Sequence, residues 1–124
     1  MKYSKEEKEE FVGKMKAKTK QFAIDAIKFC DRLPKTQAYR TISFQLIKSA
    51  SSTGVNYRAA CRGRSKAEFH SKTSITVEEA DESQYWLEII KGLDTPSDEE
   101  ELSRLLKEIG EILAVVTKAR YNTK

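Results

Sequence analysis

One stretch of the sequence, residues 43–87, constrains the fold of this chain more than any other. It reads as two amphipathic helices that meet at a short basic turn, residues 62–66. Small or hydroxyl-bearing residues take many positions where a helical bundle usually has leucine, and small side chains let helix axes approach closely. The stretch therefore predicts a tightly packed helix pair and says little about chemistry. The small residues are Ser49, Ala50, Ser52, Thr53, Ala59, Ala60, Thr73, Thr76, Ala80 and Ser83.

The turn between these two helices carries its own stop and start signals. Gly63 suits the position just after a helix end, and Ser65 suits the N-cap of the following helix. Glu68 follows Ser65 by three residues, which is the spacing of a capping box. The two helices are therefore predicted to be antiparallel neighbours.

Two further helices flank this pair. The first is predicted to begin after Ser4 and to end before Pro34, because proline disfavours helix in the preceding residue. The last is predicted to begin at Thr95 or Ser97 as N-cap, with acidic residues in its first turn that complement the helix dipole. The tail from Arg120 onward is expected to fray. The acidic residues of that first turn are Asp98, Glu99, Glu100 and Glu101.

Two glycines lie at informative places in the middle helices. The second helix is predicted to start near Thr36, and Gly54 interrupts its pattern. An interior glycine costs about 1 kcal/mol relative to alanine, and either a crossing helix or a kink would explain it. Gly92 is predicted to end the third helix.

Each of the four helices has apolar residues at a spacing of three and four, and no β alternation is present. The sequence therefore predicts an all-α protein, an antiparallel up-down-up-down four-helix bundle forming a single domain over residues 1–124. A composition of 39% hydrophobic and 34% charged residues suits long helices with wide solvated faces. The predicted core residues are Phe11, Met15, Phe22, Ala26, Phe29 and Leu33; Tyr39, Ile42, Leu46, Ala50, Thr53, Tyr57, Ala60 and Cys61; Phe69, Thr73, Thr76, Ala80, Ser83, Leu87 and Ile90; and Leu102, Leu105, Leu106, Ile109, Ile112, Leu113 and Val116.

A group of basic residues around the turn is the strongest functional signal. The net charge of +4 and the pI of about 9.0 favour acidic partners, although surplus solvated lysine would give the same values. Arg58 and Arg62 share a helix face, while Arg64 and Lys66 continue the charge around the turn. Because arginine suits bidentate phosphate contacts, these four residues, named here the basic cluster, are predicted to bind nucleic acid. The alternative is that Arg58 and Arg62 pair internally with Glu68, Glu79 or Glu82.

No catalytic residue, metal site or cofactor is predicted. A di-metal bundle would need Glu-x-x-His pairs, and the single histidine, His70, has no glutamate three residues before it. Cys30 and Cys61 form no Cys/His cluster and are expected to be free thiols in a reducing cytoplasm. No apolar run approaches the ~18 residues of a membrane span, so no membrane partner is expected.

Two positions bear on packing and assembly. Asn56 lies among small residues in mid-helix, where a buried, hydrogen-bonded asparagine that fixes helix register is expected rather than a base-reading contact. Trp86 and Leu87 point to adjacent faces of one helix. Either the third helix packs on two sides, one of them against a second subunit, or its core stripe is wide.

Several of these residues form a pattern in a fixed order and spacing. The chain has Asn56, a Glu-Glu-Ala-Asp-Glu run at residues 78–82 and Tyr-Trp-Leu at residues 85–87. The rest of the pattern consists of Gln45-Leu46, Ser49-Ala50-Ser51-Ser52, Arg64-Ser65 and Glu68-Phe69.

This pattern resembles the bacterial four-helix bundle proteins encoded within 23S rRNA intervening sequences. The stand-alone members, which carry the acidic run and Tyr-Trp-Leu, are the nearer match. The rRNA-encoded branch has an Ala-Glu-Gly step after the asparagine, whereas this chain has Arg58-Ala59-Ala60, so the role of that glutamate does not transfer to this chain.

The resemblance implies a homopentamer with no established function. The related accessory protein of diversity-generating retroelements has a similar bundle and pentamer and acts with a reverse transcriptase and nucleic acid. The expectation is therefore a non-catalytic, oligomeric protein associated with RNA or DNA, with a reverse transcriptase as a partner by analogy. The alternative is a structural or protein-partner scaffold without nucleic-acid affinity.

Overall fold

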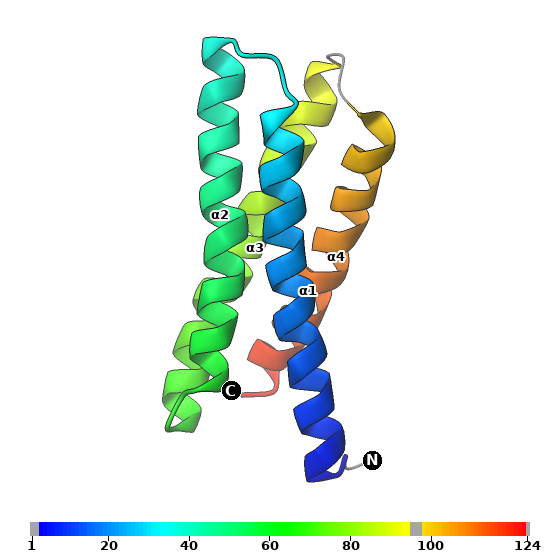
Figure 1. The fold of residues 1–124 in the computed structure, drawn as a ribbon. Helices are drawn as coiled ribbons and strands as arrows, with labels where there is room; N and C mark the ends of the chain where they lie inside the picture. Colours follow the sequence, from blue (N-terminus) through cyan, green and yellow to red (C-terminus); the bar gives the residue numbers. More distant parts are fainter. Residues whose placement is uncertain (1–2, 95–97, 124) are drawn as a thin grey trace.

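The chain folds into four long helices in a computed structural model that describes residues 3–94 and 98–123. The helices are α1 (Lys5–Asp31), α2 (Gln37–Cys61), α3 (Lys66–Leu93) and α4 (Glu99–Tyr121). Each runs antiparallel to the next, and α1 packs against both α2 and α4, which also flank α3 (Figure 1). The described residues contain no strand, and the predicted all-α four-helix bundle is confirmed.

The first three helices begin at the predicted caps. Ser4 and Glu7 form a reciprocal capping box at the start of α1, and the Thr36 side chain caps α2. The Ser65 hydroxyl accepts the Glu68 backbone N–H at 3.0 Å. The predicted capping box at Ser65 is only half formed, since the structure gives this cap no return bond from the Ser65 backbone N–H to the Glu68 carboxylate.

The predicted boundaries between α3 and α4 are wrong. Gly92 lies inside α3, which continues to Leu93, and Asp94 takes the left-handed conformation with φ 49°. A short polar side chain such as that of Asp tolerates this conformation. Asp98 is the N-cap of α4, since its carboxylate accepts the Glu101 N–H at 3.0 Å. The caps proposed from sequence, Thr95 and Ser97, lie outside the described residues.

Two glycines mark places where helices approach closely. A Cβ on Gly54 would lie 3.5 Å from the Thr19 hydroxyl of α1, and α2 is unbroken, so a crossing helix explains this glycine. A Cβ on Gly63 would lie 3.1 Å from the Ala60 carbonyl and 3.2 Å from the Phe69 backbone nitrogen. Its φ is not positive, so Gly63 serves the tightness of the turn rather than a left-handed cap.

Most predicted core positions are buried, and the exceptions lie at the edges. Phe11 is 52% exposed, which contradicts its predicted place in the core. The start of α1 extends beyond its neighbours and its first buried residue is Met15 (Figure 1). Four other predicted core residues, Cys61, Phe69, Leu106 and Leu113, are buried only in part. Trp86 is also half-buried and packs against the core from its edge.

The small residues of α2 and α3 form a closely packed contact whose hydroxyls are satisfied locally. Thr53 and Thr76 donate to backbone carbonyls of their own helices. Ser83 donates to Ser49 across the contact at 2.9 Å. Asn56 is only half-buried and bonds to Ser52 on its own helix, so the prediction that it fixes register between helices is wrong. The side-chain hydrogen bond between Ser83 and Ser49 joins the two helices instead.

Candidate nucleic-acid interface

The basic cluster lies at one end of the bundle. Arg58 is in the last turn of α2, Arg62 caps that helix, Arg64 lies in the turn and Lys66 begins α3. All four side chains are exposed. The start of α1 and the end of α4 lie at the same end of the molecule (Figure 1). Four helix termini therefore surround the predicted site.

The positive charge of the basic cluster is largely unneutralised. Within the described part of the chain, Arg58 and Arg62 have no carboxylate within 4.0 Å. Arg64 lies 3.9 Å from Glu68, and its side chain is 90% exposed. Such an exposed pair contributes little to stability. The cluster can therefore present its charge to a ligand.

The register of α2 and α3 separates Arg58 from Glu79, one of the carboxylates in the alternative pairing. Ser49 lies opposite Ser83. Arg58 is nine residues further along α2, so it faces the level of Ser74, nine residues back along antiparallel α3. Glu79 instead lies beside Ser52, roughly 9 Å from the level of Arg58 at 1.5 Å per residue. Burial and the nearby charge of Glu82 raise the pKa of Glu79, although Ser52 and Lys48 act against this.

The end of α4 is fastened to the start of α3 by two hydrogen bonds, named here the C-terminal clasp. Arg120 Nε donates to Ser74 Oγ at 2.8 Å, and His70 Nδ1 lies 2.6 Å from Thr123 Oγ1. The segment from Arg120 onward, which the sequence predicts to fray, is helical to Tyr121, and the side chains of Arg120 and Thr123 bond to α3. A shallow depression of about 500 Å³ beside the clasp is lined by Lys66, Ala67, His70 and Thr123.

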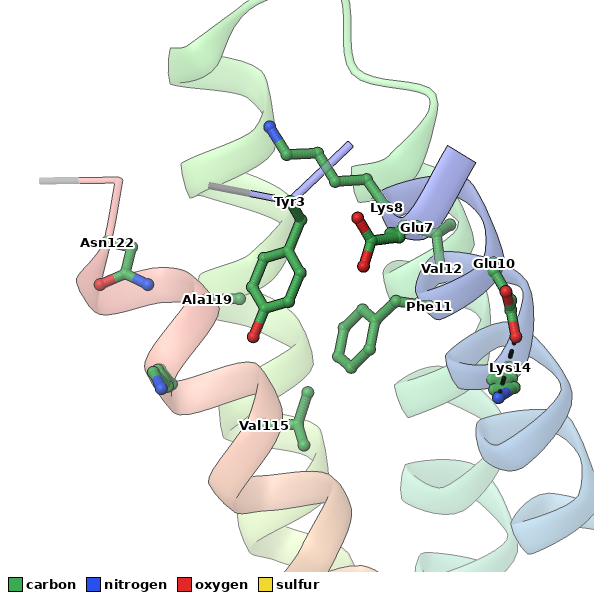
Figure 2. Close-up of a pocket in the computed structure, with 11 residues that line it drawn as sticks. Tyr3, Glu7, Lys8, Glu10, Phe11, Val12, Lys14, Val115, Ala119 and Asn122 are labelled. Carbon is green, nitrogen blue, oxygen red and sulfur yellow. Dashed lines mark ion pairs between the residues drawn. The ribbon is translucent and has the colours of Figure 1, made fainter. Parts of the chain in front are cut away.

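A larger hollow, named here the aromatic cleft, lies between the start of α1 and the end of α4. Its volume is about 650 Å³. Figure 2 shows the rings of Tyr3 and Phe11 projecting into it from the α1 side, opposite Val115 and Ala119 of α4. Tyr3 is 63% exposed and Phe11 is 52% exposed. The cleft therefore presents two accessible aromatic rings over an apolar wall.

The carboxylates around the aromatic cleft are engaged elsewhere, so two of its lysines can contact a ligand. Glu7 is held in the capping box with Ser4, which lowers the pKa of its carboxyl. Glu10 pairs with Lys14 at 3.1 Å. Within the described residues, Lys8 and Lys118 have no ion pair, and both line the cleft.

Cys30 and Cys61 are free thiols, and burial raises the pKa of Cys30 to about 11. Burial, together with neighbouring Cys61, also raises the pKa of Tyr57. Residues 3–94 and 98–123 contain no group of three or more His, Cys, Asp or Glu side chains placed to hold a metal ion. No helix in this part of the chain is long and apolar enough to cross a membrane.

The sequence prediction missed the clasp and the cleft. His70 and Thr123 are 53 positions apart, and no local sequence pattern predicts their contact. Phe11 lies four residues before Met15, a spacing that predicts a shared buried face. A usable signal was the composition of residues 3–10, where Tyr3 is the only apolar residue of an otherwise polar or charged segment. Such a segment is solvated, so a neighbouring phenylalanine is expected at its edge.

Comparison with known proteins places most of the bundle in one family. A protein of unknown function from the S23 ribosomal protein family of Bacteroides thetaiotaomicron VPI-5482 is 26% identical in sequence. The two structures superpose with a TM-score of 0.78 over 89% of this chain and 97% of that chain. No curated protein matches this chain. Residues 13–118 match the sequence profile of the 23S rRNA-intervening sequence proteins, and the chain belongs to that family.

Proposed function

We propose that this protein is a non-catalytic, oligomeric RNA-associated protein whose basic cluster binds phosphates. The observation that carries the proposal is the exposed and largely unneutralised charge of Arg58, Arg62, Arg64 and Lys66 around a single turn. Arginine and lysine bind phosphate backbones largely without regard to base sequence. The family's description as 23S rRNA-intervening sequence proteins supports RNA as the nucleic acid to test first.

Oligomerisation is part of the proposal, because four charges on one subunit bind nucleic acid weakly. Repeating the basic cluster around a ring would multiply the contacts and raise avidity. Exposed apolar side chains on the outer faces of α2 and α3, such as Phe44, Val55 and Tyr85, support a surface that other subunits cover. Five subunits is the number that the family resemblance suggests. Light scattering should give this mass, and a monomer mass at tens of micromolar protein would contradict it.

The basic cluster can be tested by charge reversal. The double variant Arg62→Glu with Arg64→Glu should lose RNA affinity many-fold, because it removes two phosphate contacts and adds two like charges. Binding of the unchanged protein should also fall steeply as salt rises. Fluorescence anisotropy with labelled RNA measures both effects, while circular dichroism and light scattering confirm that fold and mass persist.

A matched control reverses two arginines at the opposite end of the bundle. Arg32 and Arg40 are also exposed, and Arg32→Glu with Arg40→Glu makes the same change in net charge. This control should weaken binding far less if the contacts are local. Equal losses in both double variants would show that only net charge matters, and undiminished binding by the Arg62/Arg64 variant would refute the site.

A scaffold without nucleic-acid affinity is the second candidate, favoured by the same exposed apolar side chains of α2 and α3. A reverse transcriptase is the protein partner that the family resemblance suggests. We place either activity in the cytoplasm, since Cys30 and Cys61 are both free thiols. A failure of the oligomer to bind any RNA at low salt would favour the scaffold.

A further inference from the structure

We propose that the aromatic cleft is a binding site for single-stranded RNA, whose bases stack on Tyr3 and Phe11. The inference rests on the proposed function and extends it, because it names the form of RNA that the molecule prefers. It places bases in a cleft between α1 and α4, away from the arginines of the α2–α3 turn.

The accessibility of the two rings is the first argument. Both Tyr3 and Phe11 leave more than half of their surface exposed, although large aromatic side chains are usually buried. Their rings project into one hollow of about 650 Å³ against an apolar wall from α4 (Figure 2). Bases that are free of a duplex stack on such rings whatever their identity, whereas paired bases are already stacked inside a helix.

The charges beside the rings are the second argument. Lys8 and Lys118 line the cleft without an ion pair in the described residues, and Glu7 and Glu10 are engaged with Ser4 and Lys14. A strand that stacks its bases on the rings would have phosphates within reach of flexible lysine side chains. Aromatic rings beside basic residues form the combination that binds single strands.

The continuity of the surface is the third argument. Asn122 lines the aromatic cleft, and the next residue, Thr123, lines the shallow depression together with Lys66 and His70. Lys66 belongs to the basic cluster. Consecutive residues of the chain therefore line the two hollows, and one of the hollows includes a member of the basic cluster. One strand can place its phosphates on the cluster and its bases in the cleft.

The experiment compares two substitutions of Phe11, one that removes the aromatic ring and one that keeps an aromatic ring. Phe11→Leu keeps an apolar side chain but removes stacking, and Phe11→Trp keeps it. The full chain is titrated into a labelled oligouridylate of about 12 nucleotides and into an RNA duplex of equal length. We expect the unchanged protein to prefer the single strand. Phe11→Leu should weaken single-strand binding at least about fivefold and leave duplex binding unchanged, while Phe11→Trp should bind as the unchanged protein does.

Salt dependence separates the roles of rings and lysines. Phe11→Leu should leave the slope of log affinity against log salt unchanged. Lys118→Gln should make this negative slope less steep by roughly 0.7, because one phosphate contact is lost. Free uridine monophosphate should compete poorly with the strand, because it lacks the contacts at the basic cluster. Strong competition would mean that the cleft is a mononucleotide pocket and would overturn the single-strand assignment.

Three other outcomes would overturn the inference in distinguishable ways. If Phe11→Leu binds the strand normally while Arg62→Glu with Arg64→Glu does not, the cleft is not used and the proposed function stands. If Phe11→Leu changes the mass in light scattering, the cleft is a contact between subunits. If the unchanged protein binds neither RNA at low salt, the proposed function fails and the cleft assignment fails with it.

Discussion

Leu105 and Leu106 are adjacent leucines of α4 with different surroundings. Leu105 has no exposed surface, whereas Leu106 is half-buried at the edge of the core. We expect Leu105→Ala to lower the free energy of unfolding by about 2–5 kcal/mol, because it leaves a cavity in a closed core. Leu106→Ala should cost less than about 2 kcal/mol, since water can replace part of the lost side chain. Urea unfolding of both variants measures the difference, and equal losses would mean that the face of α4 is assigned wrongly.

At the scale of single residues, periodicity predicted the interior well and the surface poorly. It identified Leu46, Ala80 and Ile109 as core because a repeat of three and four fixes which face of a helix is buried. It misplaced Phe11, because the same repeat continues along α1 where the side chain faces the aromatic cleft instead of a packed core. It also gave Asn56 a partner on another helix, although a mid-helix asparagine can bond to its own backbone. Contacts between distant residues, such as His70 with Thr123, have no local signature.

At the scale of helices, the crossing of α1 over α2 at Gly54 gives a test of packing tolerance. A Cβ at Gly54 would meet Thr19 at an ordinary contact distance of 3.5 Å, and a Cβ at Gly13 would meet nothing within 4 Å. Alanine at either position should raise the free energy of unfolding by up to ~1 kcal/mol through helix propensity.

Leucine should distinguish the two glycines. Gly54→Leu should destabilise by about 1–3 kcal/mol, because the longer side chain meets the Thr19 backbone. Gly13→Leu should be neutral or better, since the position is open. Thermal unfolding followed by circular dichroism measures all four variants. A Gly54→Leu protein as stable as its Gly13 counterpart would show that the two helices can separate at no cost.

The sequence also predicted helix starts better than helix ends. Ser4, Thr36 and Ser65 cap as expected, because a hydroxyl three residues before a free N–H has one favourable geometry. The end of α3 was predicted too early, at Gly92, since glycine is common after a helix end. The structure uses Asp94 instead, and a single sequence does not separate these neighbouring alternatives.

At the scale of the molecule, ion pairs between α1 and α4 make stability depend on pH. Asp25 lies 2.8 Å from Arg104. Burial raises the pKa of Asp25, but hydrogen bonds from Arg104 and Gln21 outweigh it, so the net pKa is lowered. A lowered pKa in the folded state gives stability that is present above the unfolded value of about 4 and is lost as pH falls through the folded value.

Asp25→Asn tests this dependence. The variant should be less stable than the unchanged protein at pH 7, and the difference should shrink as the pH falls below about 4. Urea midpoints measured across a pH series give the comparison. Glu10→Gln removes an exposed pair with Lys14 and should have little effect at pH 7. A difference for Asp25→Asn that stays constant down to acid pH would contradict the role of this pair.

The contact between α1 and α4 joins the first and the last of these four helices to be synthesised. Lys18 bonds to Glu111, 93 positions later in the chain. The α2–α3 hairpin can close during synthesis, whereas one side of α1 has no neighbour until α4 has emerged. At ~5–20 residues per second, synthesis of the 23 residues of α4 lasts on the order of a few seconds. During that interval the nascent chain exposes core residues that the finished bundle covers, and this is the stage at which a chaperone would protect it most.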